Sequence, residues 1–152
     1  MRVAFAADHG GAALKKQLLQ ALRAAEVEHD LIDLGGDGSD PADDYPDFSL
    51  RLGRAIQEGA ADRNVLICGS GVGASIAATK MRGVRACVCH DTYSARQGVE
   101  HDDMNVLCLG ARVIAIELAL ECTRAFLRAN FSGEPRHVRR LNKVLAIEAA
   151  ER

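Results

Sequence analysis

The fold is decided by the stretch Val65-Leu66-Ile67-Cys68-Gly69-Ser70-Gly71-Val72-Gly73, in which a short apolar run ends at a cysteine and passes into a loop with three glycines. A short apolar run that leads into glycines is typical of a buried β-strand. Residues 74–80, which follow the loop, have the composition of a helix. The stretch therefore predicts a strand, a tight loop and a helix, the repeating unit of parallel α/β sheets.

The same unit recurs on both sides of this stretch. The apolar run at residues 3–7 ends at Asp8, and Leu14, Leu18 and Leu22 then follow at the four-residue spacing of an amphipathic helix. Turn residues at 35–41 and a Gly-Glu-Pro break at 133–135 separate further elements. The other expected elements are strands at residues 29–34, 84–89 and 106–109 and helices at residues 48–57, 112–129 and 136–150, with a helical segment also after residue 89.

Strands alternate with helices throughout, which implies right-handed crossovers and parallel strands. We therefore predict an α/β fold, a Rossmann-like three-layer α/β/α sandwich with a parallel sheet of about five strands and a C-terminal helix. The length of 152 residues suits one hydrophobic core. Residues 1–152 are thus expected to form a single domain.

The composition excludes several classes of function. The 19 Lys and Arg residues against 21 Asp and Glu residues give a formal net charge of −2, which argues against nucleic acid or an anionic membrane as a partner. No apolar run approaches the roughly 18 to 20 residues that cross a bilayer, and the N-terminus turns polar too early for a secretory signal. We expect a cytoplasmic protein that binds any anionic ligand through a few local residues and not through a broad basic surface.

The cysteines predict neither a disulfide framework nor a zinc site. Their count of five is odd, no C-x-x-C pair occurs, and most of them lie in apolar runs where a free thiol packs like a small hydrophobic residue. With no Trp and an aromatic content of 4%, the chain also has little material for stacking single-stranded bases. No metal is expected. The five are Cys68, Cys87, Cys89, Cys108 and Cys122.

Reactive side chains follow the expected strands. Because the carboxyl ends of parallel strands meet at one edge of the sheet, where such folds bind ligands, we expect these side chains to converge there. His101 is expected in a polar turn of the connection to the fifth strand. The residues concerned are Asp8 and His9 after the first strand, Cys68 at the end of the third, His90 and Asp91 after the fourth, and His101.

The Gly69-x-Gly71-x-Gly73 loop admits three interpretations. Its backbone N–H groups suit a phosphate, a carboxylate or an enediolate oxygen. Alternatively, the glycines only supply the positive φ of a tight turn. A dinucleotide site is the third possibility, with Asp91 about 20 residues on as the ribose-binding acid, although the G-x-G-x-G spacing differs from G-x-G-x-x-G.

Two further features suit the chemistry of a small anion. Cys68 stands at a strand terminus beside the loop N–H groups, where a thiol is placed to exchange protons, whereas the other cysteines are expected in the core. Arg136 and Arg140 lie at i and i+4 of the last expected helix and could clamp a phosphate, or form a solvated basic face. No role is assigned to His137 between them.

Together these residues resemble the ribose-5-phosphate isomerase B family, the RpiB/LacAB group of sugar-phosphate isomerases. No single piece is specific, but their order and spacing jointly are, and they run through essentially the whole chain. The pieces are Asp8-His9-x-Gly11, Asp44-Tyr45-Pro46, residues 68–73 followed by residues 75–78, residues 101–105, Gly110-x-Arg112-Val113, and Arg136 with Arg140.

The resemblance implies a cofactor-free aldose–ketose isomerase that acts on a small phosphorylated sugar, typically converting ribose 5-phosphate to ribulose 5-phosphate. It implies Cys68 as the base, Ser70 with the loop N–H groups as the enediolate stabiliser, and His101, helped by Asp8, for ring opening. It also implies homodimers or dimers of dimers with sites at the interface, the partner supplying His101, Asp102 and Arg112. The implied substrate-binding residues are His9, Tyr45, Gly69, Gly71, Gly73, Asp102, Arg112, Arg136 and Arg140.

The chain departs from the family pattern at three positions. Some relatives carry a Glu base where this chain has Ala74, so Cys68 is the only matching base. Asp102 stands where Asn is common, and Ser70 where Thr is common. Tetrose 4-phosphates and hexose 6-phosphates therefore remain possible substrates, and a nucleotide-binding module or a catalytically dead sugar-phosphate sensor are alternatives from other classes.

Overall fold

The computed structural model describes residues 1–25 and 28–151 and consists of one five-stranded parallel sheet with six helices. The strand order is β2-β1-β3-β5-β4. The strands are β1 (Arg2–Ala7), β2 (Asp30–Asp33), β3 (Arg63–Cys68), β4 (Ala86–Val88) and β5 (Val106–Gly110). The helices are α1 (Ala12–Ala24), α2 (Tyr45–Gln57), α3 (Val72–Ala78), α4 (Thr92–Asp102), α5 (Ile116–Arg128) and α6 (Pro135–Ala150).

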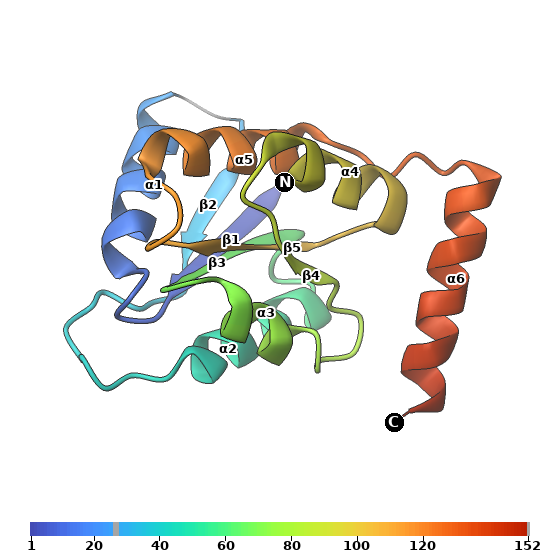
Figure 1. The fold of residues 1–152 in the computed structure, drawn as a ribbon, viewed down its shortest axis with the longest axis horizontal. Coiled ribbons are helices and arrows are strands. Elements are labelled where there is room, and N and C mark those ends of the chain that lie inside the picture. Colours follow the sequence, from blue (N-terminus) through green and yellow to red (C-terminus); the bar gives the residue numbers. More distant parts are fainter. Residues whose placement is uncertain (26–27, 152) are drawn as a thin grey trace.

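Helices cover both faces of the sheet, which confirms the predicted three-layer arrangement. Figure 1 shows α2 and α3 on one face and α1, α4 and α5 on the other. The side chains of β1 alternate between the two layers: Val3 and Phe5 join the core under α1, α4 and α5, while Ala4 and Ala6 join the core over α2 and α3. Burial on both faces explains why the central strands read as continuous apolar runs.

The strand order reverses between β1 and β3. The chain proceeds from β1 outward to β2 on one side, and from β3 toward β5 and β4 on the other. The carboxyl ends of β1 and β3 therefore flank the point at which open α/β sheets form their ligand crevice. A backbone hydrogen bond from Asp8 N–H to the Ile67 carbonyl, at 3.2 Å, ties the two ends together.

Several boundaries differ from the expected ones. Helix α2 begins three residues early, because Pro46 in its first turn has no N–H that needs a partner. Helix α5 begins at Ile116 instead of residue 112, because the N–H groups of Arg112 and Val113 donate to the carbonyls of Gly69 and Gly110 and hold a turn there. Helix α3 spans 72–78 instead of 74–80, and β4 is shorter than the strand expected at 84–89.

Helix α6 stands away from the body of the molecule, beyond α4 and β4 (Figure 1). Of its 16 residues only His137 is buried, and Val144 and Ile147 are more than half exposed. The helix therefore leaves an apolar face without cover in a single copy. Within the described part of the chain, no helix has the length and apolar character needed to cross a bilayer.

Candidate active site

The turn after β1 places a buried carboxyl group at the strand-order reversal. Asp8 is only 7% exposed, and its Oδ1 accepts the N–H of Gly11 at 3.1 Å. Burial raises the pKa of this carboxyl group above its ordinary value. Gly11 is required here because a Cβ would lie 2.3 Å from the Ile67 carbonyl oxygen, so the turn after β1 packs directly on β3.

Cys68 is the last residue of β3 and is 4% exposed. The N–H of Gly71 donates to its Sγ at 3.0 Å, so the glycine loop fixes the position of the sulfur. Gly71 has φ +82°, the left-handed conformation that glycine adopts without strain. The glycine loop is therefore the tight turn that one interpretation predicted, and it also directs an N–H group at the cysteine.

Ser70 and Tyr45 line the outer side of the glycine loop. Ser70 is exposed, and its Oγ accepts the N–H of Val72 at 3.2 Å. The ring of Tyr45 lies against Gly73 so closely that a Cβ there would be 2.7 Å from the ring. Helix α2, which begins at Tyr45, therefore brings an aromatic side chain over the loop that follows β3.

Arg112 also lies at this edge of the sheet. Its N–H donates to the Gly69 carbonyl at 2.9 Å, and its guanidinium group lies 3.5 Å from the point where a Cβ of Gly69 would be. We call this set the carboxyl-edge half-site: Asp8, His9, Tyr45, residues 68–73 and Arg112. The resemblance had grouped Arg112 with His101 on a partner chain; the structure instead places it with Cys68 of its own chain.

His9 is held by a residue that the sequence analysis missed. Both its backbone N–H and its Nδ1 contact Oδ1 of Asp43, at 2.8 Å and 2.6 Å. This hydrogen bond is the main reason that the pKa of His9 is raised. Asp43 is 34 positions away in the sequence, so no local spacing could have indicated the pair.

His101 does not converge on the carboxyl edge, contrary to expectation. It lies in the last turn of α4, not in a polar turn, and α4 returns the chain to the amino edge where β5 begins. Val106 of β5 pairs with Asn64 of β3, while Gly110 pairs with Cys68. The four steps from Val106 to Gly110 span about 13 Å. His101 therefore lies at the opposite edge of the sheet from Cys68 of the same chain.

A cluster of side chains fixes the ring of His101. The amide nitrogen of Gln97 contacts Nδ1 at 2.8 Å, and the ring of His137 is stacked on it with centroids 3.9 Å apart. With Gln97 as donor, Nδ1 accepts and the neutral ring carries its proton on Nε2. His137 is 1% exposed and bonds Ser132 Oγ through Nδ1 at 2.6 Å. It thus has a structural task that the sequence did not reveal.

The remaining predicted site residues lie beside this cluster. Asp102 is exposed at the end of α4, and Arg136 and Arg140 are exposed one helical turn apart on α6. Nε of Arg136 is 2.8 Å from Glu134 Oε2, which holds its guanidinium group near the start of the helix. We call His101, Asp102, Arg136 and Arg140 the amino-edge half-site.

Two suspected residues have structural roles instead. Asp91 is the N-cap of α4: its Oδ1 accepts the N–H of Ser94 at 2.7 Å, which lowers the pKa of the carboxyl group. The acid that a ribose-binding site would need is therefore engaged in capping. His90 Nε2 accepts the N–H of Gly110 at 2.9 Å. Among residues 1–25 and 28–151, no group of three or more His, Cys, Asp or Glu side chains is arranged to hold a metal ion.

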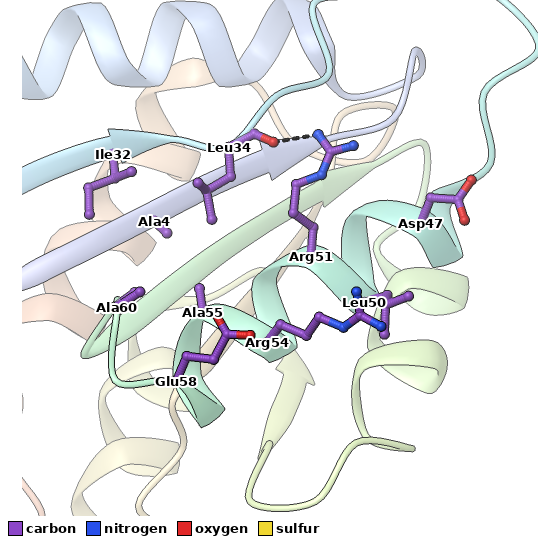
Figure 2. Close-up of a pocket in the computed structure, with 11 residues that line it drawn as sticks. Ala4, Ile32, Leu34, Asp47, Leu50, Arg51, Arg54, Ala55, Glu58 and Ala60 are labelled. Atoms are coloured by element: carbon purple, nitrogen blue, oxygen red, sulfur yellow. Dashed lines mark hydrogen bonds between the residues drawn. The ribbon is translucent and has the colours of Figure 1, made fainter.

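Two hollows lie away from Cys68. One, of about 590 Å³, lies between β2 and α2 (Figure 2); its floor is apolar, and Arg51, which lines it, donates to the Leu34 carbonyl at 2.6 Å. The other, of about 990 Å³, runs between the edge strand β4 and α6 and is lined by residues such as Cys87 and Val144. The second hollow is bordered by the amino-edge half-site through Asp102.

Known proteins resemble the chain over nearly its whole length. Residues 3–144 match the model of the ribose/galactose isomerase family. The chain belongs to this family. It is 42% identical to ribose-5-phosphate isomerase B of Escherichia coli over 97% of this chain and 96% of the relative. It is also 33% identical to D-erythrulose-4-phosphate isomerase 2 of Mycolicibacterium smegmatis, over 99% of both chains.

The structural comparison agrees with the sequence comparison. Ribose-5-phosphate isomerase B of Clostridium thermocellum superimposes with a TM-score of 0.91 at 41% identity, over 100% of both chains. The predicted family and the Rossmann-like fold are thereby confirmed, and this member of the ribose/galactose isomerase family is an aldose–ketose isomerase. The sugar that it isomerises is a separate question, because its relatives differ in that respect.

Proposed function

We propose that residues 1–152 form one isomerase domain that interconverts ribose 5-phosphate and ribulose 5-phosphate without a cofactor, in a site shared by two copies of the chain. The observation that carries the proposal is the division of the predicted site residues between two edges of one sheet. Each half-site holds part of the chemistry: the carboxyl edge has the cysteine and the glycine loop, and the amino edge has the ring-opening histidine and the two arginines.

A two-fold dimer would complete both sites. In a C2 dimer each copy presents the same surface to the other. If the carboxyl-edge half-site of one copy meets the amino-edge half-site of its partner, the reverse contact forms as well. Two identical sites result. No rearrangement within one chain achieves this, because the sheet itself separates Cys68 from His101.

Helix α6 offers the surface for the second copy. Its Val144 and Ile147 are exposed in a single copy and line the hollow of about 990 Å³ between this helix and β4. An uncovered apolar patch of this kind marks an interface. We propose that a second copy packs against α6 and thereby brings its own glycine loop toward His101.

Ring opening is the first chemical step. The C1–O bond of the furanose breaks as a proton leaves the anomeric hydroxyl and another reaches the ring oxygen. Nε2–H of His101, fixed by Gln97 at Nδ1, is the donor to the ring oxygen. The carboxylate of Asp8 from the other copy accepts the hydroxyl proton. The raised pKa of this buried carboxyl group makes it a better base than an exposed one.

Proton transfer between C2 and C1 is the second step. The thiolate of Cys68 removes the C2 proton, and the electrons move to O1 to form an enediolate. A proton then passes from O2 to O1, the C2 carbonyl forms, and the Cys68 thiol returns its proton to C1. The Gly71 N–H, which donates to Sγ, holds the sulfur in position. The hydroxyl of Ser70 donates to the enediolate oxygen, and this hydroxyl is polarised because its oxygen already accepts the Val72 N–H.

The phosphate end supplies the binding energy. His9 of one copy and the guanidinium groups of Arg136 and Arg140 of the other would enclose the phosphate. Contacts at this non-reacting end hold C1 and C2 against Cys68. The exposure of both arginines in the single chain agrees with a ligand that arrives from outside it.

Turnover on a panel of four-, five- and six-carbon aldose phosphates, with EDTA present throughout, tests the proposal. We expect the highest kcat/KM with ribose 5-phosphate and no loss of rate with the chelator. A clear preference for a tetrose phosphate would move this chain to the activity named for its Mycolicibacterium relative. Restoration of an EDTA-inhibited rate by a divalent cation would reject the metal-free mechanism.

A further inference from the structure

We propose that Asp43 is a positioning residue for the phosphate end of the substrate: it holds His9 in the orientation and charge state in which Nε2 donates to the phosphate. The inference rests on the proposed function, because it takes His9 as a phosphate ligand. It adds a residue from the loop between β2 and α2 that does not itself touch the substrate.

Asp43 contacts both the backbone and the ring of His9. One carboxylate oxygen, Oδ1, accepts the backbone N–H of His9 at 2.8 Å and lies 2.6 Å from Nδ1 of its ring. The first bond fixes the backbone of the turn and the second fixes the ring. With Nδ1 donating to the carboxylate, Nε2 is the ring atom left for a ligand.

The two side chains differ in how far they are exposed to an incoming ligand. The side chain of Asp43 is 14% exposed, whereas that of His9 is 39% exposed. The carboxylate is therefore the covered member and the imidazole the accessible one. An incoming phosphate meets the imidazole, while the negative charge of Asp43 stays shielded from it.

The loop that carries Asp43 is anchored at both ends. At its start, the Gly35 carbonyl accepts the Ala7 N–H at 3.2 Å and Nζ of the buried Lys15 at 2.9 Å. Just before Asp43, Asp40 Oδ1 accepts the N–H of Ala42 at 2.9 Å. The Gly35 bonds tie the start of the loop to β1 and α1, and the Asp40 bond forms a turn within the loop shortly before α2 begins. The position of Asp43 therefore follows from the fold and needs no bound substrate.

Electrostatics favour the charged imidazole. The charged groups that act on His9 are Asp43, whose hydrogen bond is the largest cause of the raised pKa, and Asp8 on the same turn. The second pKa of a phosphate monoester is about 6, so the substrate is mostly a dianion at neutral pH. A protonated histidine binds a dianion better than a neutral one does. The pair thus extends phosphate binding into the pH range in which an isolated histidine loses its charge.

Asp43→Asn tests the proposal, with Asp44→Asn as the matched control. Both remove one carboxylate from the same loop, but Asp44 is exposed and its side chain makes no capping hydrogen bond. The pKa and tautomer of His9 are measured by NMR in the intact protein, with and without inorganic phosphate. KM for ribose 5-phosphate and for ribose is then measured between pH 6 and pH 8.

In Asp43→Asn, we expect the pKa of His9 to fall toward its ordinary value of 6.5. We also expect KM for ribose 5-phosphate to rise several-fold more at pH 8 than at pH 6, with the KM for ribose and the Asp44→Asn control unchanged. An unchanged His9 titration would overturn the proposal. So would an equal rise in KM at both pH values, which indicates that Asp43 only pins the loop. Phosphate-induced shifts at His9 in a protein that turns over no sugar phosphate would support this inference and reject the proposed reaction.

Discussion

The imidazole rings of His101 and His137 are stacked, with centroids 3.9 Å apart and planes inclined by 26°. The contact joins the last turn of α4 to the first turn of α6. Burial lowers the pKa of His137, which favours its neutral ring. One contact therefore positions both the ring of His101 and the start of helix α6.

His137→Ala should lower kcat by about tenfold, because a ring held on one side only by Gln97 loses its fixed orientation. His137→Phe keeps an aromatic ring in the stack and should recover most of the rate. Steady-state kinetics of both variants, with thermal unfolding to verify the fold, provide the measurement. If Phe and Ala lower kcat equally, the stacking does not position His101.

The sheet could be predicted from sequence because its signals are local. Apolar runs for buried strands and glycines at tight turns are visible in five to ten consecutive residues, and the glycine loop after Cys68 needed no tertiary information. Helix boundaries near prolines and turns were less accurate. Helix α5 begins late because Arg112 donates to Gly69, a contact between segments 43 residues apart in the sequence.

The strand pattern predicted that the candidate site residues meet at one edge of the sheet, whereas the structure divides them between two edges. His101 was expected at the carboxyl edge because it precedes a strand in a polar segment, and only the length of α4 shows that it lies at the other edge. Asp43 carries no motif, and its bond to His9 depends on the path of the eleven-residue loop between β2 and α2. In the sequence, His137 is one more polar residue of a basic helix. Its contact with His101 is visible only once α6 is known to lie beside α4.

Cys68→Ala should lower kcat by about two or more orders of magnitude and leave KM nearly unchanged, because the base is lost while the phosphate contacts remain. Cys87→Ser is the control: it also removes one thiol, but from the exposed edge strand β4. Initial rates over a range of ribose 5-phosphate concentrations separate the two parameters. A near-normal kcat for Cys68→Ala would exclude this residue as the base.

Arg140→Ala should raise KM for ribose 5-phosphate about tenfold or more, because a charge-assisted hydrogen bond to the phosphate is worth about 1.5 to 3 kcal/mol. Turnover of ribose, which has no phosphate, should not change. Arg139→Ala removes the neighbouring charge on the same exposed helix and should have little effect. Equal losses with both sugars would show that Arg140 supports the helix and not the phosphate.

Asp102→Asn should change the ratio of kcat/KM between ribose 5-phosphate and erythrose 4-phosphate by an amount equivalent to about 1 to 3 kcal/mol. A carboxylate only accepts hydrogen bonds, whereas an amide also donates, so the two side chains read a sugar hydroxyl differently. Asp102 is exposed in the single chain, which leaves it available to a substrate held by a second copy. Measurement of both substrates with both proteins decides the matter, and an unchanged ratio would assign Asp102 to the helix end alone.

Mixing two inactive variants should restore activity if the site is shared. In a mixed dimer of Cys68→Ala and His101→Ala, one site combines both altered halves, while the other combines the intact Cys68 of one copy with the intact His101 of its partner. Random pairing makes half of the dimers mixed, each with one working site of two, so about a quarter of the wild-type rate per chain should return. Neither variant regains activity alone. The measurement is the rate after the two proteins are unfolded together and refolded, compared with each refolded separately. A mixture no more active than the sum of its parts would place the complete site within one chain, and the separation of Cys68 and His101 across the sheet argues against that outcome.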